Sequence, residues 1–338
     1  MNITYLVGNG FDLYLGMRTR PRDFLQNFID ENEKSENSAA ASLASTIKSE
    51  GIDTWADFEM SLGRLSQMFN NTEDDISDYL EQVEALETHL RQWLLREDEK
   101  MTDDRLREKA DILLSSFANI LPILSKDGIR FQDNPNREYN LNFISFNYTS
   151  TFRRALFIAS KNLLRDMERL TDSSGRGFNL SSFIQPHGTL DTVLVCGVDG
   201  ADQISNPDLQ VNEDVIASIV KGETQRADNY DFDLEAMEII NRSDIVCIFG
   251  MSLGRSDRRW WRHIADSLTN IGSPLNWVVV FSYELNGANL TVPPARIKAK
   301  NQVRKAFLAA AETGDATNDK IKTQIQVFPA SALLPNCV

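Results

Sequence analysis

Cysteine, histidine, glycine and proline are all scarce in this chain of 338 residues, which has three cysteines, three histidines, 17 glycines and ten prolines. The low content of glycine and proline excludes collagen-like and low-complexity proteins. Cys196, Cys247 and Cys337 are odd in number and widely spaced, so they predict neither a disulfide framework nor a zinc ribbon. We therefore expect a globular protein of a reducing compartment.

Long apolar runs and an excess of basic residues are also missing. The longest apolar runs, such as Trp277–Phe281, are far shorter than the roughly 20 residues that cross a bilayer. The first residues lack the basic segment and the apolar core of a secretory signal. The formal net charge is −14, which disfavours nonspecific binding to nucleic acid, because that binding needs a basic face. These absences predict a cytoplasmic protein that neither enters a membrane nor coats DNA.

The negative charge is concentrated in one segment. Between Asp30 and Ala110 there are 21 acidic and nine basic residues. From residue 53 to about residue 125 the apolar residues recur at the spacing of amphipathic helices, and Pro122 is expected to end or bend the last of them. We predict an acidic helical subdomain over residues 31–139, inserted into a core formed by residues 1–30 and 140–338. Three explanations of its negative charge remain open: a solvated helical face, a contact with a partner, or a contact between copies of the chain.

Short apolar, β-rich runs lie on both sides of this segment. Helical patterns separate several of them, for example at Thr151–Asp166, Asp233–Asn241 and Asp257–Leu268. The runs are continuously apolar rather than alternating, which is typical of a parallel sheet covered on both faces. We predict an α/β fold with a Rossmann-like, mostly parallel sheet. The strand candidates are Ile3–Val7, Leu141–Phe146, Phe183–Gln185, Val193–Val198, Asp244–Gly250, Trp277–Ser282 and Gln324–Phe328.

The first strand candidate ends in a glycine turn, Gly8-Asn9-Gly10-Phe11-Asp12. Glycines at a strand-to-helix turn let the backbone approach a pyrophosphate, and the start of the helix offers N–H donors. The full dinucleotide fingerprint is absent, because Leu13 stands where the third glycine would be. From this motif alone, nucleotide binding and a plain tight turn remain equally open.

Two later turns carry single polar side chains after strand candidates. Asn147 follows the run that ends at Phe146, and its amide is suited to hold a ribose hydroxyl or a water molecule; capping of the next helix is the alternative. His187 lies between Pro186 and Gly188 after the next run. A histidine there is suited to act as a general base, and a hydrogen bond to a backbone carbonyl is the alternative.

A further turn, Gly250–Asp257, again follows an apolar run and opens a helix. Its small residues permit close backbone approach, so Gly250, Ser252 and Asp257 are candidate nucleotide contacts, with a capped helix start as the alternative. The acids Asp12, Asp57, Glu59 and Asp257 leave open a magnesium site, although no spacing among them is specific for a metal.

Taken in order, these motifs resemble the AbiH family, the bacterial abortive-infection proteins against phage. The matching stretches are Gly8–Leu13, Trp55–Glu59, Ser145–Thr149, His187-Gly188 and Gly250–Asp257. More distantly the pattern is similar to the Sir2-type NAD-binding fold, with its glycine turn, its asparagine element, its His-Gly pair and its late Gly-x-Ser turn.

The resemblance implies a Sir2-like core that binds NAD as a substrate. Asn147 and His187 would be the catalytic pair. The residues implied to bind the dinucleotide are Gly8, Asn9, Gly10, Phe11, Asp12, Gly188, Gly250, Ser252 and Asp257. Because this chain has no cysteine pairs for the zinc ribbon of deacetylating sirtuins, the resemblance implies NAD hydrolysis rather than protein deacylation, and no metal.

Three functions remain as hypotheses at this point. The first is an antiphage effector that binds NAD and hydrolyses its nicotinamide N-glycosidic bond. The second is a metal-dependent nuclease or nucleotide phosphohydrolase that uses the acids named above. The third is a nucleotide-binding sensor without catalysis. The expected partners are a dinucleotide and, as a trigger, a phage-derived protein, while self-association stays open.

Overall fold

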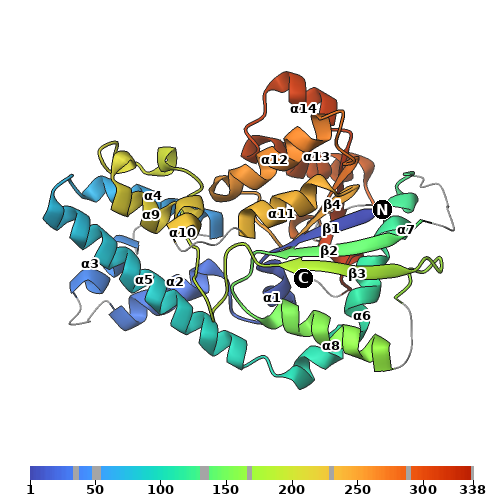
Figure 1. Cartoon of the computed structure of the whole chain (residues 1–338), viewed down its shortest axis with the longest axis horizontal. Coiled ribbons are helices and arrows are strands. Elements are labelled where there is room, and N and C mark those ends of the chain that lie inside the picture. The colour runs from blue at the N-terminus through green and yellow to red at the C-terminus, as the bar shows by residue number, and fades with distance from the viewer. Residues whose placement is uncertain are drawn as a thin grey trace.

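The computed structural model describes residues 1–32, 38–47, 55–129, 137–165, 170–227, 232–286 and 291–335. Within these ranges the centre of the fold is one six-stranded sheet, in which every neighbouring pair of strands is parallel (Figure 1). The strand order is β3-β2-β1-β4-β5-β6. The strands are β1 (Asn2–Val7), β2 (Tyr139–Ser145), β3 (Phe178–Ile184), β4 (Ile245–Phe249), β5 (Trp277–Ser282) and β6 (Ile325–Pro329).

The predicted α/β, Rossmann-like class is confirmed by this sheet. Its inner strands are continuously buried, as β4 shows with five buried residues in a row, because helices cover both faces. The strand predicted at Val193–Val198 is wrong. That run forms isolated bridges only, from Leu194 to Gly188 and from Val198 to Val220. The run is apolar because it packs beneath helices, where Cys196 is 1% exposed. A short apolar run does not by itself show whether a sheet or a group of helices buries it.

Two sets of helices cover the two faces of the sheet (Figure 1). One set is α1 (Gly10–Tyr14), α6 (Asp103–Ala118), α7 (Ile120–Lys126) and α8 (Thr151–Arg165). The other set is α11 (Phe232–Asn241), α12 (Arg258–Thr269), α13 (Pro293–Ala310) and α14 (Asp315–Ile321). The break before Pro122 agrees with the sequence, since α6 ends at Ala118 and α7 starts two residues later.

A separate group of helices, here called the helical body, lies beyond the carboxyl ends of the strands (Figure 1). Its helices are α2 (Pro21–Asn32), α3 (Ser38–Ile47), α4 (Trp55–Leu65), α5 (Glu73–Glu99), α9 (Glu213–Ile219) and α10 (Lys221–Ala227). All but α10 contribute to a hydrophobic cluster of their own, which also holds Tyr148 and Cys196. The boundaries predicted for the helical insert, residues 31–139, stay a prediction. Helices α6 and α7 lie within these boundaries and pack on the sheet, whereas α2 and α9 lie mostly or wholly outside them and pack in the helical body.

Short 3-10 turns join these elements at η1 (Ser66–Met68), η2 (Ala201–Gln203), η3 (Leu209–Val211), η4 (Arg255–Asp257), η5 (Tyr283–Leu285) and η6 (Ala330–Ala332). Among the residues that the structure describes, no helix combines the length and the apolar character needed to cross a membrane. Cys196 and Cys247 are buried thiols, and Cys337 lies outside the described residues.

The turns after β1 and β4 pack directly against each other through glycines. A Cβ atom on Gly8 would lie 2.6 Å from Cγ of Met251, and one on Gly250 would lie 2.7 Å from Cα of Gly10. Gly250 also has a φ of 69°, which disfavours other residues. These three glycines are therefore required by the packing of the two turns.

We predict that Gly10→Ala lowers the free energy of unfolding by about 1–3 kcal/mol, because its Cβ would overlap the backbone of Gly250. Urea-induced unfolding measures this change. Gly314→Ala is the matched control, since a Cβ there meets no atom within 4 Å. Equal stability of the two variants would contradict the packing argument.

Candidate functional site

A cavity of about 370 Å³ opens where the turns after β1, β2 and β4 meet. In a sheet of this order, β1 is the point at which the connections change direction, and ligands bind outside the carboxyl ends of the strands there. The lining residues are Gly8, Asn9, Gly10, Asp12, Leu13, Arg20, Pro21, Glu59, Leu94, Phe146, Asn147, Tyr148, Thr149, His187, Gly250, Met251, Ser252, Asp257 and Tyr283.

Nearly all the residues predicted from the sequence lie around this cavity. Two do not. Phe11 is fully buried in the core, where its ring packs edge-on to that of Phe152 at 4.8 Å. Gly188 forms a turn with a φ of 74° against the carbonyl of Val193. Both residues therefore lie next to the cavity and are not part of its lining.

Three backbone N–H groups of the glycine turn are already engaged in hydrogen bonds to backbone carbonyls. The amides of Gly8 and Gly10 donate to the carbonyls of Phe249 and Gly250, at 2.9 and 2.8 Å. The amide of Phe11 donates back to Gly8 at 3.0 Å, and the hydroxyl of Tyr283 donates to the carbonyl of Gly10 at 2.6 Å. The turn is therefore a rigid wall of the cavity, and these three amides are not available to a ligand.

Asp12 points into a group of hydroxyls. Its carboxylate accepts hydrogen bonds from Thr149 at 2.8 Å and from Thr151 at 2.6 Å, and its side chain is buried. Burial raises the pKa of Asp12 to about 7, although the two threonine hydrogen bonds act in the opposite direction. The group therefore titrates near neutral pH.

Asn147 follows the end of β2, and within the described residues the nitrogen of its side-chain amide is hydrogen-bonded while the oxygen is not. Its Nδ2 donates to Asp12 at 3.4 Å, and its backbone carbonyl accepts from Gln185 at 2.9 Å. Its Oδ1 is buried and has no hydrogen-bond partner among the described residues. A buried polar atom without a partner costs free energy unless a ligand or water satisfies it.

His187 is buried among aromatic rings. Its imidazole packs edge-on to Phe146 at 5.0 Å and lies 6.3 Å from the ring of Tyr148. Its Nε2 makes no hydrogen bond to any described residue and lies 3.6 Å from Oδ1 of Asp257. Burial and the charge of Lys221 hold the pKa of His187 well below its ordinary value, although Asp257 raises it. The imidazole is therefore neutral at pH 7.

A buried lysine that no sequence motif predicts, Lys221, lies beside His187 and Asp257. The ammonium of Lys221 contacts Asp257 at 2.7 Å and Glu59 at 2.8 Å, and its side chain is fully buried. Burial alone would raise the pKa of Asp257, but the charge of Lys221 holds it below its ordinary value. Burial raises the pKa of Glu59 to about 7. Asp257 therefore serves as the partner of Lys221, which leaves it little freedom to bind a nucleotide.

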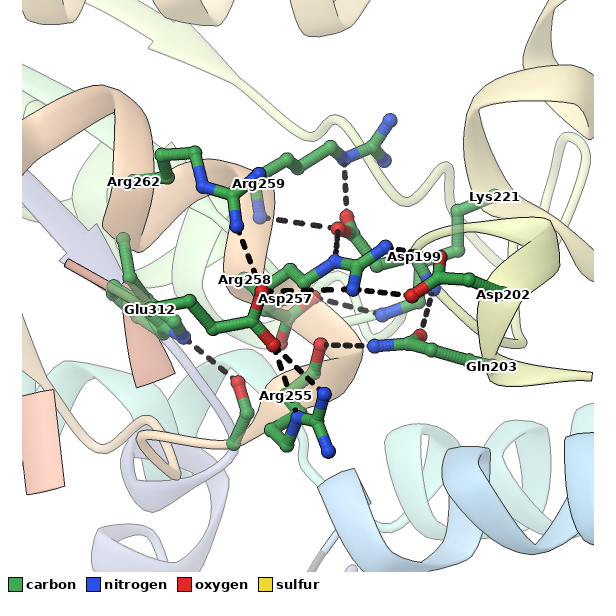
Figure 2. A network of polar contacts seen from close by, with 12 residues as sticks. Asp199, Asp202, Gln203, Lys221, Arg255, Asp257, Arg258, Arg259, Arg262 and Glu312 are labelled. Carbon is green, nitrogen blue, oxygen red and sulfur yellow. Dashed lines mark hydrogen bonds and ion pairs between the residues drawn. The ribbon is translucent and has the colours of Figure 1, made fainter. Parts of the chain in front are cut away.

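A network of ion pairs fixes the η4 turn that carries Asp257 (Figure 2). Arg258 binds Asp202 and, at 3.1 Å, Asp199, on the segment around η2. On the other side, Glu312 at the end of α13 accepts from Arg255 at 2.8 Å and from Arg262 at 2.7 Å. These contacts join the turn to the segment around η2 and to the end of α13.

The acids considered for a metal site do not gather into one. Within the described ranges, no group of three or more histidine, cysteine or acidic side chains is arranged to hold a metal ion. Asp12 is bound by threonines, while Glu59 and Asp257 share Lys221. The side chain of Asp57 is exposed and does not line the cavity.

Comparison with known proteins agrees with the resemblance seen in the sequence. A family model described as "Bacteriophage abortive infection AbiH" matches residues 4–281. No curated protein and no solved structure matches the chain. The similarity to the Sir2-type fold stays a prediction.

We predict that Lys221→Met lowers the free energy of unfolding by about 3–5 kcal/mol, because it leaves two buried carboxylates unpaired. Denaturant unfolding measures the loss. Lys322→Met is the control, since Lys322 forms a largely exposed pair with Asp319 and should cost under about 1 kcal/mol. A small effect at Lys221 would show that the buried triplet is not formed.

The raised pKa of Asp12 predicts that the stability of the protein depends on pH. A carboxyl whose pKa rises from 3.8 when unfolded to about 7 when folded binds more protons in the native state, so stability falls as pH increases through this window. Asp12→Asn removes this dependence. The stability of the wild type relative to Asp12→Asn should fall by on the order of 4 kcal/mol between pH 4 and pH 7. A difference that stays constant with pH would contradict the burial of this acid.

Proposed function

The chain belongs to the AbiH family of bacteriophage abortive-infection proteins, and on this premise we propose that its cavity binds NAD and hydrolyses the nicotinamide N-glycosidic bond. The observation that carries the proposal is a pair of buried side-chain atoms, Oδ1 of Asn147 and Nε2 of His187. Neither has a hydrogen-bond partner among the described residues, and both side chains line one cavity at the carboxyl ends of parallel strands. A ligand that offers a donor to each would satisfy them.

The chemistry of a nucleotide's ribose fits this pair. A ribose hydroxyl, or the water that attacks the ribose, is a donor suited to the amide oxygen of Asn147. In the reaction, the oxygen of water bonds to C1′ of the nicotinamide ribose while the bond from C1′ to the ring nitrogen breaks. Nicotinamide leaves with the bonding electrons, and the other product is ADP-ribose. One proton of the attacking water must be taken up.

His187 is the group proposed to take that proton. Its lowered pKa keeps the imidazole neutral at pH 7, and the negative charge of Asp257 at 3.6 Å raises its basicity and stabilises the imidazolium that forms. Its burial among Phe146 and Tyr148 keeps bulk water away from the reacting carbon. Asn147 would hold the water or the ribose hydroxyls in the attacking geometry.

We predict that the purified protein releases nicotinamide from NAD⁺, and that His187→Ala lowers the rate by about 10²–10⁴-fold because the general base is lost. Asn147→Ala should also abolish most of the release. Chromatographic measurement of nicotinamide follows the reaction, with His263→Ala as the control histidine outside the cavity lining. The samples are run with and without EDTA, and with lysate of phage-infected cells as a source of a trigger.

The outcomes separate the three hypotheses. Release that ignores EDTA and disappears in the Asn147 and His187 variants supports hydrolysis. Full activity in His187→Ala removes that residue from the mechanism. Cleavage of a phosphoester or pyrophosphate bond that EDTA abolishes, without release of nicotinamide, favours the phosphohydrolase. An NAD-induced rise in melting temperature without any cleavage favours the sensor.

A further inference from the structure

We infer that the phosphates of the nucleotide are recognised by Arg20 at the mouth of the cavity. This inference rests on the proposed function and adds the group that would select a phosphorylated substrate. Its starting point is that the turn after β1 has already used the amides of Gly8, Gly10 and Phe11 on its own carbonyls and on those of the neighbouring turn. These three amides therefore do not serve a phosphate, which favours a side-chain donor.

The charges around the cavity point to one residue. Among the described residues that line it, Arg20 is the one lysine or arginine. The acids on the same wall are already neutralised or hydrogen-bonded, since Asp12 is held by threonines and both Glu59 and Asp257 face Lys221. An anion that enters the cavity thus meets one uncommitted positive charge.

The backbone that carries Arg20 is held in place from both sides. The carbonyl of Thr19 accepts from Nδ2 of Asn9 at 2.8 Å, which ties this loop to the glycine turn. The carbonyl of Arg20 accepts from the amides of Asp23 and Phe24 in the first turn of α2, at 3.0 and 3.1 Å. Its own side chain is exposed, and no ion pair joins it to another described residue. A fixed backbone with a free guanidinium is suited to receive a ligand.

The size of the cavity agrees with a phosphate at its mouth. A volume of about 370 Å³ lies near the lower end of the roughly 300–1,000 Å³ range of small-molecule sites. A whole dinucleotide is not enclosed by it, so with the nicotinamide riboside end against Asn147 and His187 the phosphates would lie at the opening. A guanidinium binds phosphate oxygens in a bidentate manner, which gives both strength and direction.

Binding of a matched ligand pair tests this inference without turnover. In the His187→Ala background, calorimetry compares nicotinamide mononucleotide with nicotinamide riboside, which lacks the phosphate, and includes inorganic pyrophosphate as a third probe. We expect the mononucleotide to bind about 10- to 100-fold more tightly than the riboside, as for a charge-assisted contact. Arg20→Gln should remove that difference and leave the affinity for the riboside unchanged.

Arg22→Gln is the matched control, because Arg22 is an exposed arginine two residues away that does not line the cavity. A preference for the mononucleotide that survives Arg20→Gln overturns the inference, and so does equal binding of the two ligands by the parent. Loss of the preference together with absence of NAD hydrolysis in the wild type supports the phosphate subsite and contradicts the proposed reaction. Arg20-dependent binding of pyrophosphate alone also supports the subsite, and binding of none of the probes overturns the inference, whereas the proposed reaction is decided by the release of nicotinamide from NAD⁺.

Discussion

The ammonium group of Lys221 joins the helical body to the sheet next to the cavity. It lies fully buried between Glu59 of α4 in the helical body and Asp257 of the η4 turn beyond β4. Three charges are tolerated inside the protein only because each lies within contact distance of an opposite charge. The position of Asp257, and with it the field that acts on His187 at 3.6 Å, depends on this triplet. The arginine network of Figure 2 holds the same turn from its outer side.

The sheet could be predicted from the sequence because its strands are continuously apolar and end in turns, and parallel strands covered on both faces leave that pattern. The run at Val193–Val198 has the same composition and is not a strand, since the helical body supplies its apolar surroundings. Local pattern does not report which partner buries a residue. For the same reason, α2 and α9 contribute to one hydrophobic cluster of the helical body although they are far apart in the sequence.

The candidate site was predictable where its residues follow strands. Asn147, the glycine turn and the Gly250 turn come together because the carboxyl ends of parallel strands meet at one edge of the sheet. Lys221 and Arg20 carry no such signal. Lys221 reaches Glu59 and Asp257 only through the packing of the helical body on the sheet, and Arg20 is exposed in a loop. The role of Lys221 follows from side-chain contacts between distant segments, which spacing along the chain does not encode.

This member of the AbiH family thus combines a Rossmann-like sheet with a cavity lined by two buried polar atoms that make no hydrogen bond to the part of the chain that the structure describes. The most direct test of the account is a crystal structure of the His187→Ala variant grown with NAD⁺. The account predicts the nicotinamide ribose against the amide of Asn147 and the pyrophosphate at Arg20. NAD⁺ bound elsewhere, for example in the groove between α13 and α14 lined by Arg304 and Lys322, or an empty cavity at saturating NAD⁺, would contradict it.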